Sequence, residues 1–338
     1  MWLIVGLVLG AGSSILLLRG DDPAAGTTTT LAEPATGEGP EGIGDVVEGF
    51  PDGLVAVSRA HGQSLQILVW PLRGEPIVRA IPAGVSRPAG PVSFDAAAGR
   101  IATLLPVPGE TNGVLYAGVP EQAAIIATEV TGYAWHDTDP SRLAYTTFAD
   151  GELFLWSLSV PSADPVIVTR AVGIVGGLRA WGDWGFALQD EERGSVVLLT
   201  DTGEIKTTQP GRVLDSDGAG WLAVIDEKLT LVSSGGGVVA GPEGLGGEIV
   251  AARFSPDGDH LALLTDGAKV VSLSNGATLA ESDQRPGVPE IAWTSDGRFA
   301  AYPGVRGITV LDIAEGGSDQ ILTERVVTGL GVLPIESS

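Results

Sequence analysis

The sequence predicts an all-β fold: a seven-bladed β-propeller of four-stranded antiparallel sheets, preceded by one N-terminal transmembrane helix and a disordered linker. Three observations support this prediction. A unit of one short strand, a tight turn and a second strand of small apolar residues recurs along the chain. The chain has 49 glycines and 22 prolines, which indicates many turns. No segment shows the capped, apolar 3.6-residue period of a soluble amphipathic helix.

The clearest copy of the unit is the stretch from Arg253 to Leu264. Its first strand ends at the aromatic Phe254, and Ser255–Gly258 form the turn. Proline sets the φ angle of that turn, aspartate bonds back to nearby backbone, and glycine takes a positive φ. The aromatic residues that end the other first strands are expected to fill the space between neighbouring sheets; the full set is Phe50, Phe94, Trp135, Trp181, Phe254 and Trp293.

The repeats divide the chain into seven units of propeller-blade length. Their predicted bounds are 43–82, 83–130, 131–172, 173–210, 211–246, 247–285 and 286–325. The fifth unit is degenerate, because Val213–Gly218 lacks the aromatic residue. Residues 45–50 have the pattern of the first strand of the first unit, and Val326–Leu333 is expected to add a strand across the seam where the ring closes.

Several third strands carry the pattern that gives WD repeats their name, among them Leu153–Leu158 and Ile308–Ile313. Together with the FSPDG turn, they make residues 43–325 resemble the WD-repeat and TolB-like bacterial β-propeller repeat family. The Gly-His pair of typical WD repeats is missing, and only Asp312 stands at the WD aspartate. The resemblance therefore favours the TolB-like bacterial class and implies the fold, while propellers host many functions.

The N-terminal residues 1–19 are predicted to be a membrane anchor, because Trp2–Leu18 is uncharged, apolar and just long enough to span a bilayer. A cleaved signal peptide is the alternative, which would make the protein secreted. Residues 20–42 are rich in Pro, Gly, Thr and acids and are predicted to be a disordered linker. The expected location of the propeller, residues 43–338, is the extracytoplasmic side of the cell membrane, although Arg19 favours a cytoplasmic-face scaffold.

The chain is strongly acidic, with 42 Asp and Glu against 19 Lys and Arg. This charge argues against binding to nucleic acid, because little basic surface is present to displace phosphate counterions. The absence of cysteine excludes disulfides, thiolate metal sites and cysteine nucleophiles. We expect no cofactor, and a monomer.

The aspartates of the predicted turns are best explained by turn chemistry and not by an acidic ring around a metal. The three histidines, His61, His136 and His260, are far apart in sequence and fall in different loop types. No metal site is predicted from them. No G-x-S-x-G nucleophile elbow is present, and no catalytic residue is predicted.

The loops that join second to third strands, and fourth strands to the next first strand, are the usual binding surface in this architecture. We call this surface the loop face. Its candidate binding residues are Arg87, Arg285, Arg306 and His61, since arginines suit a carboxylate or another anion. The predicted function is a non-enzymatic binding or scaffold module of a bacterial cell envelope, whose partner is an envelope protein or a small ligand. The alternative is a propeller enzyme, lactonase-like or glycoside-hydrolase-like.

Overall fold

The structure, a computed structural model, contains β-strands and no helix in the residues it describes. These are residues 50–59, 66–70, 77–80, 93–95, 100–106, 112–118, 124–136, 141–150, 152–159, 165–171, 175–181, 185–217, 220–226, 228–243, 247–305, 307–322 and 326–333. Within these ranges no segment forms a helix long and apolar enough to cross a membrane. The predicted anchor and linker lie outside the described residues and stay predictions.

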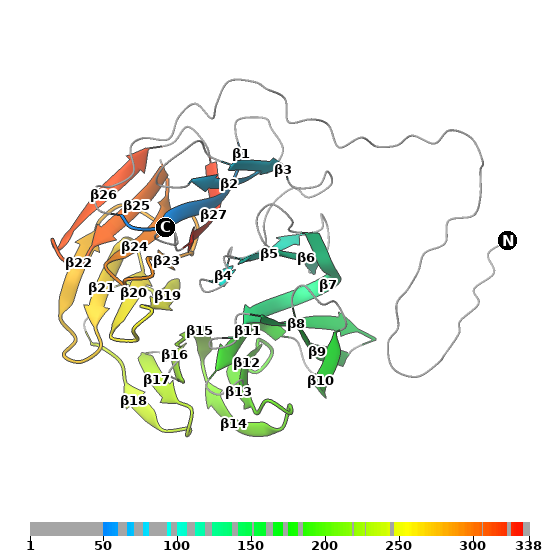
Figure 1. Ribbon diagram of the computed structural model, residues 1–338. Helices are drawn as coiled ribbons and strands as arrows, with labels where there is room; N and C mark the ends of the chain where they lie inside the picture. Colours follow the sequence, from blue (N-terminus) through cyan, green and yellow to red (C-terminus); the bar gives the residue numbers. More distant parts are fainter. Residues whose placement is uncertain are drawn as a thin grey trace, which may run out of the picture. The chain divides into compact units, whose positions relative to one another are not determined.

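Five of the sheets contain four antiparallel strands each (Figure 1). The first is β27-β1-β2-β3 (Val326–Leu333, Gly53–Arg59, Gln66–Trp70, Ile77–Ala80). The next two are β11-β12-β13-β14 (Val175–Trp181, Gly185–Asp190, Ser195–Leu199, Ile205–Pro210) and β15-β16-β17-β18 (Arg212–Ser216, Trp221–Ile225, Leu229–Ser233, Val238–Ala240). The last two are β19-β20-β21-β22 (Ala251–Phe254, His260–Leu264, Ala268–Ser272, Thr278–Ser282) and β23-β24-β25-β26 (Ala292–Trp293, Phe299–Gly304, Gly307–Asp312, Gly317–Leu322).

A sixth sheet joins seven strands through one long strand, β7. Its order is β10-β9-β8-β7-β6-β5-β4, with bounds Val166–Ala171, Glu152–Ser159, Arg142–Ala149, Ala124–Trp135, Gly113–Gly118, Arg100–Pro106 and Ser93–Asp95. The predicted unit boundary at 130/131 therefore falls inside a continuous strand, which corrects that boundary. No turn interrupts β7 at residues 130 and 131. Instead Glu129 takes a φ of 58°, and Val130 pairs with both β6 and β8.

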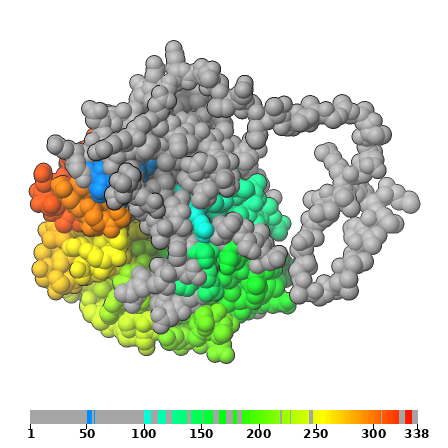
Figure 2. Space-filling view, viewed as in Figure 1, coloured from blue at the N-terminus to red at the C-terminus, as the bar shows by residue number. Residues whose placement is uncertain are grey.

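The first strand of each unit lies nearest a common centre (Figure 1). We call β27, β4, the C-terminal half of β7, β11, β15, β19 and β23 the first strands. Successive first strands contact one another from β27 through β4, β7, β11 and β15 to β19, and β23 contacts β27. Trp293 joins β23 to β19, because its indole Nε1 donates to the carbonyl oxygen of Arg253 at 3.1 Å. In the space-filling view the later sheets follow one another around the visible face, coloured from green to orange (Figure 2).

The hydrophobic core lies between neighbouring sheets and not within one layer. One cluster packs Leu214 and Leu231 of the β15–β18 sheet against Phe254 and Leu261 of the β19–β22 sheet. Another packs Ala262 and Val270 of that sheet against the side chains of the next, Trp293 and Tyr302 among them. Phe50, Trp135, Phe254 and Trp293 are all buried, which confirms packing as the role of these four aromatic residues. The side chains of Phe94 and Trp181 are not described.

The ring is closed by the last strand of the chain. Strand β27 pairs antiparallel with β1, with Leu54 opposite Val332 and Ala56 opposite Leu330. The prediction that Val326–Leu333 adds a strand across the seam is confirmed. Residues 45–49, predicted to be part of a first strand, lie outside the described residues. Phe50 still packs across the seam, with its ring 5.4 Å from that of Phe299.

Candidate functional site

Of the four candidate residues on the loop face, the structure describes only Arg285. Arg87, Arg306 and His61 lie outside the described residues, so their role stays a prediction. Arg285 is exposed and lies between β22 and β23, a fourth strand and the next first strand. The next residue, Pro286, forms a β-bridge with Gly304 at the end of β24. The bridge brings the two predicted loop types together at this point.

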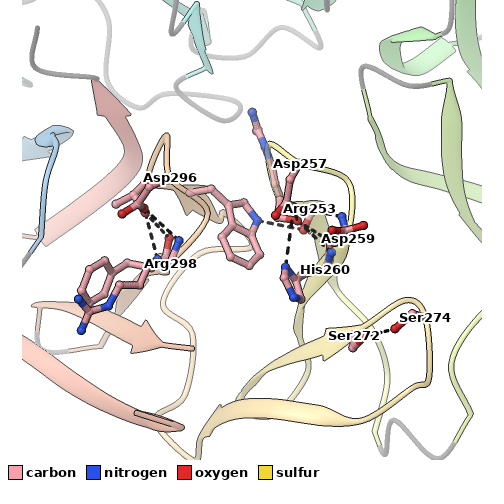
Figure 3. Close-up of polar contacts among 12 residues, drawn as sticks. Arg253, Asp257, Asp259, His260, Ser272, Ser274, Asp296 and Arg298 are labelled. Atoms are coloured by element: carbon pink, nitrogen blue, oxygen red, sulfur yellow. Dashed lines mark hydrogen bonds and ion pairs between the residues drawn. The ribbon is translucent and has the colours of Figure 1, made fainter. Parts of the chain in front are cut away.

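The turn aspartates of the last two sheets are occupied by their own turns (Figure 3). Asp257 accepts hydrogen bonds from the Ser255 hydroxyl and from its neighbour two residues on, the Asp259 amide. Asp296 accepts from the Thr294 hydroxyl and the Arg298 amide in the same way. These bonds confirm the interpretation as turn chemistry for the two residues.

Asp52 departs from that interpretation because it bonds to another sheet. Its carboxylate accepts the backbone amide of Ser295 at 2.5 Å and the Ser295 hydroxyl at 3.1 Å. Asp52 is buried and precedes β1, whereas Ser295 lies in the turn between β23 and β24. Asp52 therefore links two sheets across the seam. The structure describes neither residue 137 nor the side chain of Asp95.

Asp312, the one residue at the position of the WD aspartate, pairs with Arg298. The guanidinium donates from Nη2 to Oδ2 at 2.6 Å and from Nε to Oδ1 at 3.2 Å. The same guanidinium lies over the ring of Phe299, 4.5 Å from its centre. The hydrogen bonds from Arg298 lower the pKa of Asp312. Burial opposes this shift, and the amides of Ala314 and Glu315 add to it. The pair holds the end of the third strand to the turn before the second.

A set of charged residues that the sequence analysis did not single out lies on the first strands. At seven places a first-strand residue pairs with a buried alanine of the second strand: Ala56, Ala102, Ala144, Ala187, Ala223, Ala262 and Ala301. In the same order the first-strand partners are Leu330, Ser93, Ala134, Arg179, Asp215, Arg253 and Ala292. Three consecutive sheets thus carry Arg, Asp and Arg at one repeated position. We call Arg179, Asp215 and Arg253 the axial cluster.

Asp215 is the centre of the axial cluster. Its Oδ1 lies 3.8 Å from Nε of Arg179, and its Oδ2 accepts the backbone amide of Phe254 at 2.9 Å. Arg179 also donates to the carbonyl oxygens of Leu178, at 3.0 Å, and Leu214, at 3.4 Å. These bonds tie β11, β15 and β19 together. The cluster contains two guanidinium groups and one carboxylate, so it carries an excess positive charge.

Burial shifts the pKa values inside the axial cluster. Desolvation raises the pKa of Asp215, while the charges of Arg253 and Arg179 and the amides of Phe254 and Ser216 oppose the rise. Desolvation also lowers the pKa of Arg179, and the charge of Arg253 lowers it further, whereas Asp215 opposes both. An arginine remains charged at neutral pH even so. The carboxylate is therefore costly to keep ionised at this position, and its two arginine neighbours partly offset the cost.

One sequence signal could have found the axial cluster. Each of its residues pairs with an alanine near the start of a second strand. Alignment of the units on that alanine places Arg179 and Asp215 in one column, and Arg253 joins them once a gap of one residue is allowed in the turn. Alignment of the units on the aromatic residue fails in the fifth unit, which lacks one. Asp215 then falls within a degenerate turn.

The part of the chain that the structure describes holds no group of three or more His, Asp or Glu side chains placed to bind a metal ion. His260 lies in the turn region, with its Nδ1 3.8 Å from Oδ1 of Asp257 (Figure 3). His61 lies outside the described residues.

Comparison with solved structures finds propeller folds. TolB from Acinetobacter baumannii aligns with a TM-score of 0.52 at 14% identity, covering 84% of this chain and 83% of TolB. A chain of a nidogen/laminin complex gives 0.50 at 11% identity, covering 85% of this chain and 99% of that one. The WD40 β-propeller domain of Doa1 gives 0.52 at 13% identity, covering 71% of this chain and 84% of the domain.

At these identities the likeness concerns the fold, and it confirms the β-propeller predicted from the repeats. No family model matches the chain, and no curated protein does.

Proposed function

We propose that the chain is a seven-bladed propeller, held at the outer side of a bacterial membrane, that binds a protein partner or a ligand without catalysing a reaction. The seven pairs between a first strand and a buried alanine support seven blades. In this count β7 serves twice, as the fourth strand of one blade and the first strand of the next. The proposal takes the protein to be a monomer.

Membrane attachment and the envelope location rest on the sequence. Trp2–Leu18 is the apolar segment, and residues 20–42 have the composition of a spacer. Protease added to intact spheroplasts should cut the spacer and release the propeller. Protection until lysis would contradict the extracytoplasmic location, and extraction by carbonate would contradict the anchor.

The observation that carries the binding role is the pair of loops joined by the Pro286–Gly304 bridge. One loop presents Arg285, for which the described residues provide no side-chain hydrogen bond or ion pair. The other presents Val305, whose residue surface is 73% exposed. A cationic group and an apolar group are thus held side by side on a rigid scaffold, which is where recognition concentrates in loop-bearing folds.

Site-specific crosslinking tests this surface. A photoreactive residue at Val305 should capture a partner in cells, and the capture should fall when Arg87, Arg285 and Arg306 are replaced by Ala, with or without His61→Ala. The matched control carries the photoreactive residue at Val238, an exposed valine on β18. A second control is Arg298→Ala, which removes an arginine from the turn side of the propeller.

The triple variant should keep the melting temperature of the wild type, because exposed charges contribute little to stability. Equal capture at both valines, or full capture by the triple variant, would place the binding surface elsewhere. Turnover of a lactone or a glycoside by the purified protein would replace the proposal with the enzyme alternative.

A further inference from the structure

We infer that the axial cluster of Arg179, Asp215 and Arg253 is a binding site for a single carboxylate group, separate from the loop face. The site lies where three successive first strands meet the centre of the propeller. Its ligand is a small carboxylate or the acidic side chain of a peptide.

The fold itself does not require charges at this position. In the other four units the residue opposite the buried alanine is Leu330, Ser93, Ala134 or Ala292. None of these four residues carries a charge. Partly burying two guanidinium groups and a carboxylate costs free energy, so their presence in three adjacent sheets calls for a role other than packing.

The hydrogen bonds of the cluster leave Arg253 incompletely satisfied. Asp215 uses one oxygen for the Phe254 amide and the other for Arg179. Arg179 is further held by two backbone carbonyl oxygens. Arg253 affects both through its charge, yet no described residue accepts a hydrogen bond from its guanidinium. Its backbone, in contrast, is fixed by the indole of Trp293.

The charge of the cluster selects the ligand. Two guanidinium groups and one carboxylate leave one positive charge, which one carboxylate neutralises. A guanidinium presents two parallel N–H groups that match the two oxygens of a carboxylate. A phosphate dianion would be repelled by the neighbouring Asp215. The net charge of −23 on the whole chain also disfavours multiply charged anions, so a monoanion fits best.

The cluster is accessible to such a ligand. A third of the Arg179 side chain is exposed, and Arg253 is partly exposed. Asp215 is buried beneath them, with 7% of its surface exposed. Both arginines therefore keep part of their surface exposed, and the carboxylate that positions Arg179 does not.

Titration of the full-length protein in detergent tests the inference. The probes are acetate, phosphate and a capped Gly-Glu-Gly peptide with its Gln counterpart, at constant ionic strength in chloride. Binding is measured by calorimetry and by the rise in melting temperature that a ligand specific to the folded state produces. We expect acetate or the Glu peptide to bind, and phosphate and the Gln peptide not to bind.

Three variants decide which residues carry the binding. Arg253→Ala should weaken carboxylate binding at least tenfold, and Arg253→Lys should weaken it less, because the charge is kept. If Arg253→Ala does not fold, Arg253→Gln tests the same point. Arg298→Ala is the matched control, because it removes an arginine that is already paired, and it should bind like the wild type.

Several results would overturn the inference. They are equal effects of phosphate and carboxylate, full binding by Arg253→Ala, and no binding by the wild type. Preference for acetate identifies a small carboxylate as the ligand, and preference for the Glu peptide identifies an acidic segment. The readout is independent of the crosslink at Val305, so failure of one site leaves the other standing.

Discussion

Asp257 and Asp215 lie on neighbouring sheets, yet their pKa values move in opposite directions. Partial burial raises the pKa of Asp257, but bonds from the Ser255 hydroxyl and the Asp259 amide, together with nearby His260, lower it below its usual value. The pKa of Asp215 is raised, because its burial outweighs the arginines and amides around it. The first carboxylate is stabilised by its turn, and the second is destabilised by its position.

The opposite pKa shifts distinguish two groups of charges: those stabilised by partners in the fold and those that burial makes costly to keep ionised. The turn acids and the Arg298–Asp312 pair each have partners that belong to the repeat, and Asp52 finds its partner across the seam. The axial cluster has two cationic groups and one carboxylate. Buried charges such as those of the axial cluster therefore indicate a binding site better than turn charges that already have partners.

The largest expected loss of stability comes from opening the ring, because the positions of both groups of charges depend on the closed ring. Deletion of residues 326–338 removes β27 and with it the buried side chains of Val327, Leu330 and Val332. Losing the burial of three such side chains costs on the order of 6 kcal/mol, a large part of a typical folding free energy. Circular dichroism should show no cooperative melting, or a melting temperature lower by more than about 10 °C.

Deletion of residues 334–338 alone is the control for the strand, and it should leave the melting temperature nearly unchanged. If both deletions melted like the wild type, β27 would not be needed for closure.

The next effect concerns a polar side chain that links two of the three sheets of the cluster and whose own polar atoms are all hydrogen-bonded. Buried Gln189 on β12 donates to the carbonyl oxygens of Ser195 and Gly211 and accepts the amide of Val213 on β15. Gln189→Leu keeps the volume and leaves these backbone groups unpaired, which costs about 1–3 kcal/mol. A chemical denaturation curve should show this loss, and Gln209→Leu on the more exposed strand β14 should not.

The opposite pKa shifts of Asp257 and Asp215 give a sharper test. A lowered pKa adds stability that is present above the unfolded pKa and disappears as the pH falls through the folded pKa. A raised pKa has the reverse effect: stability is lost as the pH rises from the unfolded pKa through the folded pKa. Asp257→Asn should therefore reduce the melting temperature at pH 7, and the difference should shrink as the pH falls below the pKa of an unfolded aspartate.

Asp215→Asn should leave the melting temperature at pH 7 unchanged or raise it, because the amide can still accept from Phe254 and no longer has to be ionised. Parallel melts of the two variants against pH make the measurement. A loss of stability at pH 7 in Asp215→Asn as large as in Asp257→Asn would show that the two carboxylates do not differ.

The fold could be predicted from the sequence because each repeat contains turn residues whose short-range interactions determine the local structure. Ser255–Gly258 and Thr294–Gly297 each contain a hydroxyl, an aspartate and a glycine at the right spacing, and the structure forms the same turn twice. Gly258 and Gly297 take φ angles of 74° and 70°, as the pattern requires. Closure by Val326–Leu333 could also be predicted, because one strand remained after the seventh unit.

The sequence did not predict features that depend on the pairing register of the strands. The bend at Glu129 hides a unit boundary inside β7, and no Gly or Pro marks it. The axial cluster depends on which residue of each first strand pairs with the recurring alanine of the second strand. A bulge between Val213 and Asp215 shifts that residue by one. Spacing from the turn therefore could not place Asp215 beside Arg179 and Arg253.

The smallest expected effect concerns the pair formed by Arg298 and Asp312, which is bonded within one sheet and lies near solvent. Because the Arg298 guanidinium lowers the pKa of Asp312, the contribution of the pair is present above the pKa of an unfolded aspartate. It should disappear as the pH falls through the lower, folded value.

Exposure screens the pair, so the effect on stability is small. Asp312→Asn should shift the melting temperature slightly downward at pH 7, and wild type and variant should converge as the pH falls through the folded pKa of Asp312. Added salt should reduce the difference at pH 7, because the Arg298 guanidinium is reached by counterions. A difference that persisted undiminished at acid pH or in high salt would mean that Asp312 acts through packing and not through its charge.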